Sequence, residues 1–370
     1  MHFKSLLLAA ALLTCLSLPV QAQLLIGRTA GFTGPVAAGV KETTDGAKLW
    51  LDAVNDKGGV NGQKIELVAL DDKFDPKLSA ENTRKLIEEN GVLAMFLSRG
   101  TPNTEAMIPL LDQHNVALIA PSSGSMVLHQ PIKKHIFNVR ATYQREAEKA
   151  VTHLHSTGTQ RIAVVYSDDS FGQDALAGAQ KGFTAQKLTP VAVEKFDRTK
   201  PDFTPIAQSL VKANPQTVIV IAAGSHVADC VKTLHTAGVM SQIVTLSNNA
   251  SAGFIKLMGE SARGIVVTQV FPNERAIAYA MIKEAQDLAK AKGIAELSPA
   301  MLEGYAGAKV LVEALRLAGP KPTRDKIQTA LENMGKFDLG GLEVSFGPND
   351  HTGLDFADLS IIGSDGRFRR

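Results

Sequence analysis

Short apolar runs alternate along the chain with longer segments whose apolar residues recur every three to four positions. The run Val218–Ile221 is apolar without interruption, which is typical of a strand buried on both faces. The segment with Ala47, Trp50, Leu51 and Val54 has the spacing of an amphipathic helix. Such repeated strand–helix units predict parallel sheets covered by helices on both sides. Strands are expected at Leu24–Thr29, Lys64–Leu70, Val92–Leu97, Val116–Ala120, Arg161–Tyr166, Val191–Phe196, Thr217–Ala222, Gln242–Leu246 and Gly264–Val270.

This alternation is interrupted twice. Around Phe137–Tyr143 a short strand leads into a second series of strands and helices, and after Phe271 a long helical stretch reaches roughly Met334. Strand patterns return at Leu342–Phe346 and Phe356–Ile362. A chain that leaves one α/β domain, builds a second and then returns would bind its ligand between the two, beside the connections.

The first residues have the pattern of an export signal. Lys4 precedes the apolar run Leu6–Leu13, and the residues up to Ala22 fit a cleavage site of the A-x-A type. The run is much shorter than the roughly 20 residues that span a bilayer. We therefore predict a periplasmic protein whose residues 1–22 are removed as a signal peptide. A lipoprotein acylated at Cys15 is the alternative, but the apolar run continues past this cysteine.

Charge and cysteine content narrow the class of protein. The chain has 39 Lys and Arg against 37 Asp and Glu, and its basic residues form no long run, which argues against nucleic acid as a partner. Removal of the signal would leave Cys230 as the only cysteine, so no intramolecular disulfide is expected. Its place in a helical pattern predicts a small core residue.

The stretch VNDKGGVNGQKIELVALDDKFDP (54–76) poses a sharper question, because two adjacent carboxylates end a strand. The glycines at 58–59 predict the end of a helix, and Asn61-Gly62 predicts a tight turn into the strand. Asp75, followed by proline, has the pattern of a helix start. Asp71 and Asp72 should point in different directions, which is unsuited to a shared metal or proton. We interpret these acids as part of the scaffold.

Enzyme motifs are missing from the sequence. It contains no G-x-S-x-G, no G-x-x-x-x-G-K-[ST] and no H-E-x-x-H, and its first loop lacks the G-x-G-x-x-G spacing. His153 and His155 are two positions apart on a predicted helix and do not share a face. We therefore predict no catalytic residue, no cofactor and no metal site.

The same stretch, N-D-K-G-G-V-N-G-Q-K-I-E-L-V…D-D…D-P, resembles the signature of type I periplasmic solute-binding proteins of the Leu/Ile/Val-binding branch. Four further segments match motifs of that branch, in the same order and with similar spacing along the chain. The resemblance therefore covers essentially the whole mature chain. The four segments are Gly31–Pro35, Phe137–Arg140, Tyr166–Gly172 and Gly264–Thr268.

The resemblance implies an α/β fold with two Rossmann-like lobes and three interdomain crossings, near residues 140–143, 269–273 and 344–348. The first lobe would comprise 23–141 plus 272–345, and the second 142–271 plus 346–370. A monomer of this kind closes on a small-molecule ligand and delivers it to a membrane ABC permease, without chemistry on the ligand. A periplasmic sensor that presents its bound state to a membrane receptor is the alternative, and neighbouring genes would discriminate the two.

Two loops of the first lobe have the local chemistry of a carboxylate site. Arg99, Gly100 and Thr101 follow a strand, and Thr101 before Pro102 predicts an N-cap with free backbone N–H groups at a positive helix end. A second loop, Ser122-Ser123-Gly124, follows the next strand and should face the same crevice. The resemblance implies that both loops hold the α-carboxylate and α-amino groups. Ordinary strand-to-helix turns are the alternative.

The resemblance places four residues of the second lobe over the ligand: Tyr143, Phe171, Ser225 and Asn248. Phe171 stands where the family often has an aromatic, and core packing is its alternative. In the first lobe, Arg99 could pair with an acidic ligand bidentately or remain an exposed loop arginine.

The ligand class follows from charge. The family's second-lobe glutamate falls at Ser247 or Asn248 here, and both are neutral, whereas a buried ammonium group needs a carboxylate. Glu42 and Asp168 are more simply solvated acids. We therefore expect weak binding of leucine, isoleucine and valine, with a small carboxylate, aromatic acid or amide left open.

Overall fold

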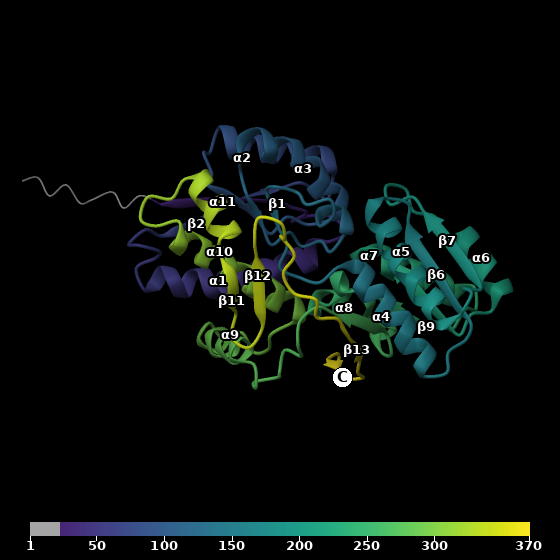
Figure 1. Cartoon of the computed structure of the whole chain (residues 1–370). Coiled ribbons are helices and arrows are strands. Elements are labelled where there is room, and N and C mark those ends of the chain that lie inside the picture. The colour runs from purple at the N-terminus through teal and green to yellow at the C-terminus, as the bar shows by residue number, and fades with distance from the viewer. Residues whose placement is uncertain (1–22) are drawn as a thin grey trace, which may run out of the picture.

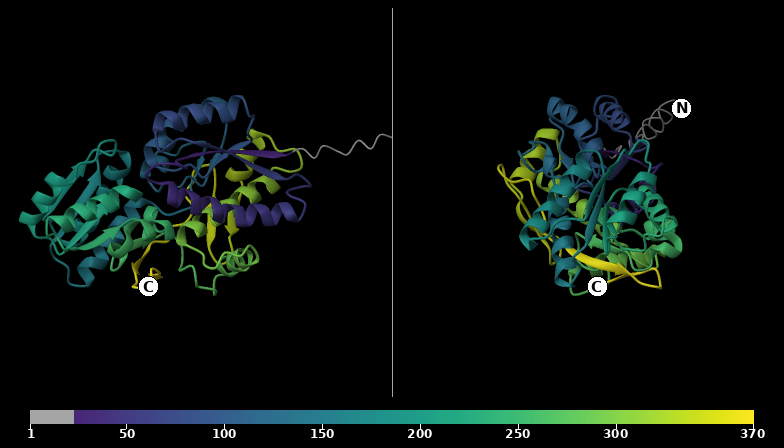
Figure 2. Two further views of the ribbon diagram at one scale, coloured as in Figure 1. Left: turned by 180° about the vertical axis from the view of Figure 1, so that it is seen from behind. Right: turned by 90° about the vertical axis from the view of Figure 1, so that its right-hand side faces the viewer.

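The computed structural model describes residues 23–370. The predicted signal peptide and Cys15 therefore lie outside the described residues. The chain forms two lobes that lie side by side, and Figures 1 and 2 show each lobe as a sheet flanked by helices. Both lobes are mixed α/β units, as the alternation of strand and helix patterns predicted.

The first lobe is built on a parallel five-stranded sheet with the order β2-β1-β3-β4-β5. Apolar side chains cover both faces of this sheet, which explains its near-continuous apolar strands. The strands are β1 (Leu24–Ala30), β2 (Ile65–Asp71), β3 (Ala94–Phe96), β4 (Leu118–Ile119) and β5 (Ile136–Phe137). The helices between them are α1 (Ala37–Asp56), α2 (Pro76–Glu88) and α3 (Thr101–His114).

The second lobe contains a seven-stranded sheet with the order β14-β13-β10-β9-β8-β6-β7. Its strands β6 to β10 run parallel, and β13 and β14 add antiparallel pairs at one edge. The strands are β6 (Ile162–Ser167), β7 (Ala192–Phe196), β8 (Thr217–Ile221), β9 (Gln242–Thr245), β10 (Val266–Gln269), β13 (Asp358–Ile362) and β14 (Phe368–Arg369). The helices are α4 (Tyr143–Ser156), α5 (Ser170–Gln186), α6 (Thr204–Ala213), α7 (Gly224–Thr236) and α8 (Ala252–Met258).

After β10 the chain returns to the first lobe. Helix α10 packs along α1, and its side chains fill the same apolar core as β1 and β3. The returning elements are α9 (Ala280–Ala291), α10 (Pro299–Leu317), α11 (Arg324–Glu332) and the hairpin of β11 (Gly335–Asp338) and β12 (Glu343–Phe346).

The third crossing lies later in the chain than the sequence analysis placed it. Phe346 and Leu354 belong to the apolar core of the first lobe, and the backbone N–H of Leu354 donates to the Val139 carbonyl (2.9 Å). The second lobe is rejoined only at β13, which begins at Asp358. An apolar strand pattern such as Glu343–Phe346 does not tell which of two sheets it joins.

The turn chemistry of the 54–76 stretch is as expected. Gly58 and Gly59 have φ of 97° and 77°, and a Cβ on Gly59 would lie 2.0 Å from the Gln63 carbonyl oxygen. Asn61 has φ 50° and Gly62 has φ 79°, so both adopt the left-handed conformation of a tight turn. These glycines are required where the chain reverses into β2.

Candidate functional site

A narrow cleft, partly open to solvent, lies between the lobes and is lined by residues of both. All of its lining residues lie at the carboxyl ends of strands, in the loops after them or at the helix starts that follow, where open α/β sheets bind ligands. They are Phe74, Arg99, Gly100, Thr101, Pro102, Tyr143, Ser167, Asp169, Phe171, Arg198, Ala223, His226 and Asn248.

An unusual backbone conformation directs the two first-lobe loops into the cleft. Leu97 and Ala120, directly after β3 and β4, are buried and both have φ 53°. The left-handed region is rare for a residue as bulky as leucine, and strain of this kind gathers at functional sites. Beyond these residues the loops pair with each other, since the Ser122 N–H donates to the Ser98 carbonyl (2.7 Å).

Arg99 reaches across the cleft from one lobe to the other. Its Nη1 donates to Ser122 Oγ (2.8 Å) and its Nη2 to the backbone carbonyl of Asn248 (2.6 Å) in the second lobe. The residue is only 4% exposed, so the alternative of an exposed loop arginine is wrong. Within residues 23–370, no carboxylate lies within ion-pair distance of Arg99, and its partners are a hydroxyl and a carbonyl.

A second buried arginine adds to the positive charge behind this loop. Arg28 on β1 donates to Thr43, to Thr44 and to the Leu97 carbonyl, all of them neutral. Burial, and after it the positive charge of Arg99, lower the pKa of the Arg28 guanidinium to about 9. Two buried guanidinium groups therefore lie close enough to repel each other on the first-lobe side.

The serine loop takes a supporting position. Gly100, with φ 91°, is the N-cap of α3, so the expectation that Thr101 caps this helix is wrong. Thr101 instead shares a 2.8 Å hydrogen bond with Ser123 Oγ. Ser122 and Ser123 are not among the lining residues and lie behind them. Gly124 packs against the backbone of residues 141–143, and a Cβ on Gly124 would lie 2.6 Å from the Ala141 carbonyl oxygen.

Aromatic rings form the walls of the cleft. Tyr143 and Phe171 pack edge to face with ring centroids 4.8 Å apart, and Phe74 faces them from the first lobe. Phe171 is 8% exposed, lines the cleft and also packs in the second-lobe core.

Asp72 explains how Phe74 is placed. It accepts hydrogen bonds from Thr29, Ser79 and the Phe74 N–H (2.9 Å), and burial raises the pKa of its carboxyl group. Asp71 binds Thr33 instead. The two acids point to different partners, which confirms that they belong to the scaffold.

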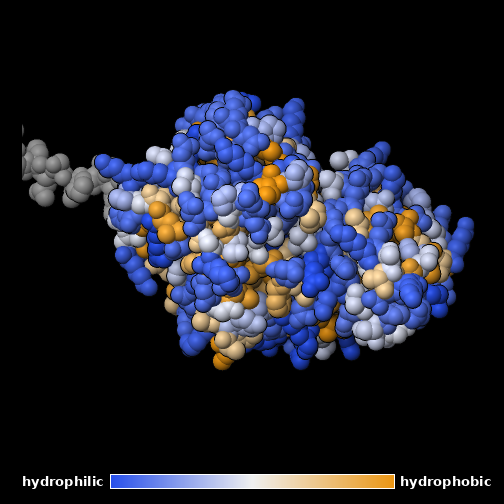
Figure 3. Space-filling model, viewed as in Figure 1, coloured by the Kyte–Doolittle hydropathy of each residue, from blue (hydrophilic) through white to orange (hydrophobic). Residues whose placement is uncertain are grey.

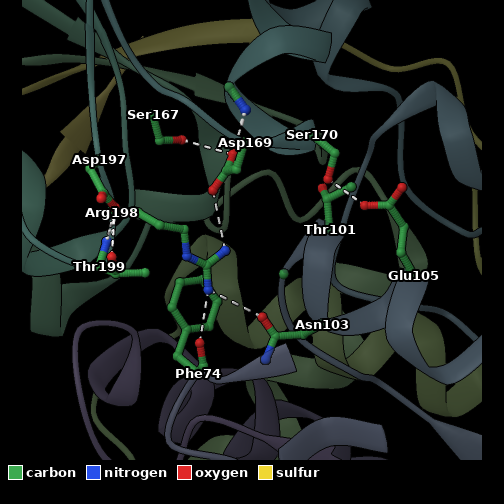
Figure 4. Close-up of polar contacts among 12 residues, drawn as sticks. Phe74, Thr101, Asn103, Glu105, Ser167, Asp169, Ser170, Asp197, Arg198 and Thr199 are labelled. Carbon is green, nitrogen blue, oxygen red and sulfur yellow. Dashed lines mark hydrogen bonds and ion pairs between the residues drawn. The ribbon is translucent and has the colours of Figure 1, made fainter. Parts of the chain in front are cut away.

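Arg198 also lines the cleft, and Figure 4 shows its guanidinium between Asp169 of the second lobe and Phe74 and Asn103 of the first. It pairs with Asp169 of its own lobe (3.2 Å) and donates to the Phe74 carbonyl (2.8 Å) and to Asn103 in the first lobe. Its guanidinium lies 4.2 Å from the centroid of the Phe74 ring. Asp169 also caps α5 through the Gly172 N–H, so this lining carboxylate is already neutralised.

The sequence analysis missed this part of the cleft. Asp169, Arg198 and His226 each follow a strand of the second lobe, and the strand-end rule applied to β6, β7 and β8 would have found them. The contacts of Arg198 with the first lobe carry no sequence signal. Ser225, which was expected in the site, does not line the cleft; its N–H donates to the Pro35 carbonyl of the first lobe (3.2 Å).

The loop after β9 offers neutral groups to the cleft. Ser247 Oγ accepts a hydrogen bond from Arg140, and Arg140 also forms an ion pair with Glu146. The Glu146 carboxylate accepts two more hydrogen bonds, from the Thr268 hydroxyl and from the Ser247 N–H. Burial raises the pKa of Glu146, and this acid is committed to Arg140 behind the cleft. Asn248 lines the cleft, and its Nδ2 donates to the Ala222 carbonyl (3.0 Å).

Residues 23–370 contain no cluster of three or more His, Cys, Asp or Glu able to hold a metal ion. The same range contains no helix with the length and apolarity to cross a membrane. On the face in Figure 3 most of the surface is hydrophilic, and its apolar residues form separate groups.

Comparison with known proteins gives consistent results. A family model described as periplasmic binding protein matches residues 23–357. The Leu/Ile/Val-binding protein of Escherichia coli is 21% identical over 72% of both chains. A substrate-binding periplasmic protein from Ralstonia solanacearum has a TM-score of 0.85 and 28% identity, over 94% of this chain and 99% of that one. A solute-binding protein of an ABC transporter from Rhodopseudomonas palustris, solved with 3,4-dihydroxy benzoic acid, has a TM-score of 0.80 and 23% identity, over 94% and 95%.

Proposed function

Because the chain belongs to the periplasmic binding protein family, we propose that it captures a small carboxylate between its lobes and delivers it to an ABC-type permease. The lobes close over the ligand, and the permease recognises the closed form. This role requires no chemistry on the ligand.

One observation carries the choice of a carboxylate. Arg99 is buried in the cleft and its hydrogen-bond partners are neutral. A buried charge is costly unless an opposite charge pairs with it. A ligand carboxylate would supply this charge, and the planar guanidinium suits a bidentate pair.

The carboxylate should lack an ammonium group on its α-carbon. An ammonium group needs an acid. Within residues 23–370, the one carboxylate that lines the cleft, Asp169, is paired with Arg198, and Glu146 behind the cleft is paired with Arg140. The side chains of Ser247 and Asn248 are neutral. The 3,4-dihydroxy benzoic acid bound by the Rhodopseudomonas palustris protein is such a ligand, whereas the Escherichia coli relative is named for amino acids.

A thermal-shift screen tests this proposal. The purified protein is heated with amino acids, aliphatic acids and aromatic acids in separate wells. A ligand at 100 times its Kd adds about 2.7 kcal/mol to the free energy of unfolding, which raises Tm by several degrees. We expect shifts with one or more acids. Shifts confined to amino acids would reject a carboxylate without ammonium as the ligand.

Export is tested separately, since the family is extracytoplasmic but the signal lies outside the described residues. Intact-mass analysis of the exported protein should give a chain that starts at Gln23. A diacylglyceryl group on Cys15 would overturn cleavage after Ala22.

A further inference from the structure

Asn248 has a hydrogen-bond acceptor that no described protein atom satisfies. The residue is 8% exposed and lines the cleft. Its Nδ2 donates to the Ala222 carbonyl (3.0 Å), which fixes the amide plane, and its Oδ1 is buried without a partner within residues 23–370. A buried acceptor without a donor costs about 1–3 kcal/mol.

The neighbouring groups do not supply that donor. The nearest guanidinium, Arg99, donates its Nη2 to the backbone carbonyl of Asn248. The amide of Asn249 is held by the Ala222 carbonyl and by Thr245 Oγ1. A ligand in the cleft could therefore supply the donor for Asn248 Oδ1.

The charge around Asn248 selects the kind of donor. An ammonium group would add a second positive charge beside the buried Arg99. Within residues 23–370, the one carboxylate that lines the cleft, Asp169, is paired with Arg198. A hydroxyl group satisfies the same acceptor without adding charge. It would stand near the ligand carboxylate, because Arg99 and Asn248 are in direct contact (2.6 Å).

Building on the proposed function, we propose that Asn248 determines specificity by accepting a hydrogen bond from a ligand hydroxyl, so that the site prefers a hydroxy acid whose hydroxyl lies close to its carboxylate. Arg99 binds the ligand carboxylate, and Asn248 Oδ1 accepts a hydrogen bond from the ligand hydroxyl. The aromatic walls, Tyr143, Phe171 and Phe74, cover the apolar remainder of the ligand.

Matched pairs of acids test this inference in isothermal titration. The probes are 4-methylpentanoate with 2-hydroxy-4-methylpentanoate, 3-phenylpropanoate with 3-phenyllactate, and benzoate with 2-hydroxybenzoate. One hydrogen bond predicts about a tenfold lower Kd for the hydroxylated member of at least one pair in the wild type. Asn248→Leu keeps the approximate size of the side chain but removes the acceptor. The ratio of the two Kd values within that pair should therefore fall close to one. The exposed Asn333 provides a control, and Asn333→Leu should keep the preference.

A second variant keeps the test decisive if Asn248→Leu fails to fold. Asn248→Asp introduces a negative charge beside the ligand carboxylate. It should therefore raise the Kd of the acids at least tenfold and lower the Kd of leucine. Wild-type binding of acids with no gain from the hydroxyl would overturn the role of Asn248 but leave the proposed function intact. A hydroxyl preference that persists in Asn248→Leu, or an Asn248→Asp variant that binds the acids as tightly as the wild type, would do the same. Failure of every acid to bind the wild type would instead reject the proposed function.

Discussion

At the residue scale, the ligand class depends on how Arg99 is held. Its guanidinium bridges Ser122 in one lobe and the Asn248 backbone in the other, at 4% exposure. An arginine in this position stabilises the closed arrangement weakly by itself, because its partners are neutral. A ligand carboxylate between the lobes would add an ion pair with the guanidinium to these contacts.

We predict that Arg99→Gln weakens binding of the best acid by about 1.5–3 kcal/mol, roughly ten- to hundredfold in Kd. Glutamine keeps a hydrogen-bond donor but loses the charge. Arg145→Gln removes an exposed arginine of α4 and serves as the control. Isothermal titration measures both variants, and equal affinities for Arg99→Gln and wild type would place the carboxylate elsewhere.

His129 makes stability depend on pH. Burial, and after it the charge of Arg140, lower the pKa of His129 from 6.5 to about 4. Between pH 4 and 6.5, His129 is therefore mostly protonated in the unfolded chain and mostly neutral in the folded chain. The stability from this group is complete above pH 6.5 and is lost as the pH falls toward 4.

The expected loss from His129 between pH 6.5 and pH 4 is about 3 kcal/mol of unfolding free energy. His129→Gln should flatten this part of the profile, whereas His153→Gln, at an exposed histidine, should keep it. Urea unfolding at several pH values measures the slope. Identical slopes in His129→Gln and wild type would contradict a buried neutral His129.

At the element scale, helices α1 and α8 meet across the cleft. The carboxylate of Glu42 on α1 accepts from the Ala252 N–H (3.0 Å) and the Gly253 N–H (2.6 Å) at the start of α8. Glu42 thus joins the two lobes, which makes it more than the solvated helix acid that the sequence suggested. Gly253 permits this approach, since its Cβ would lie 2.6 Å from Ala38 Cβ of the first lobe.

Gly253→Ala should therefore oppose closure and leave the folding of each lobe intact. Overpacking of this kind costs about 1–3 kcal/mol, which we expect as weaker ligand binding and a larger radius of gyration in the bound state. Gly347→Ala is the matched control, because nothing lies within 4 Å of its added Cβ. Titration and small-angle scattering give the two readouts. A variant that binds and closes like the wild type would show that α1 and α8 do not meet in the bound form.

The same elements show what the sequence could predict. Strands such as Thr217–Ile221 were found because burial on both faces leaves an uninterrupted apolar run. The loop after β3 was found because Arg99, Gly100 and Thr101 follow such a strand. Arg198 was missed because its partners, Phe74 and Asn103, lie in the other lobe. The hairpin strand β11 was missed because Gly335–Asp338 is mostly exposed and has no apolar pattern.

At the scale of the whole molecule, the lobes touch through several groups around the cleft. Arg99 of the first lobe bonds to Asn248 of the second, and Glu42 of α1 bonds to the start of α8. Figure 4 shows two further contacts between the lobes: Arg198 with Phe74 and Asn103, and Ser170 with Glu105. An apolar cluster, with Ala223 against Val36 and Val40, joins them. A ligand stabilises this arrangement only by binding it better than the open one.

The central claim is that this clamp binds an acid without an ammonium group, and one titration tests it most directly. Leucine and 4-methylpentanoate differ only in the ammonium group, as do phenylalanine and 3-phenylpropanoate. Isothermal titration of the wild-type protein should give a lower Kd for the acid of at least one pair, by more than tenfold, because Asp169 and Glu146 are committed to arginines. Submicromolar leucine binding, tighter than that of 4-methylpentanoate, would contradict the claim and point to Asp169 as the partner of an ammonium group.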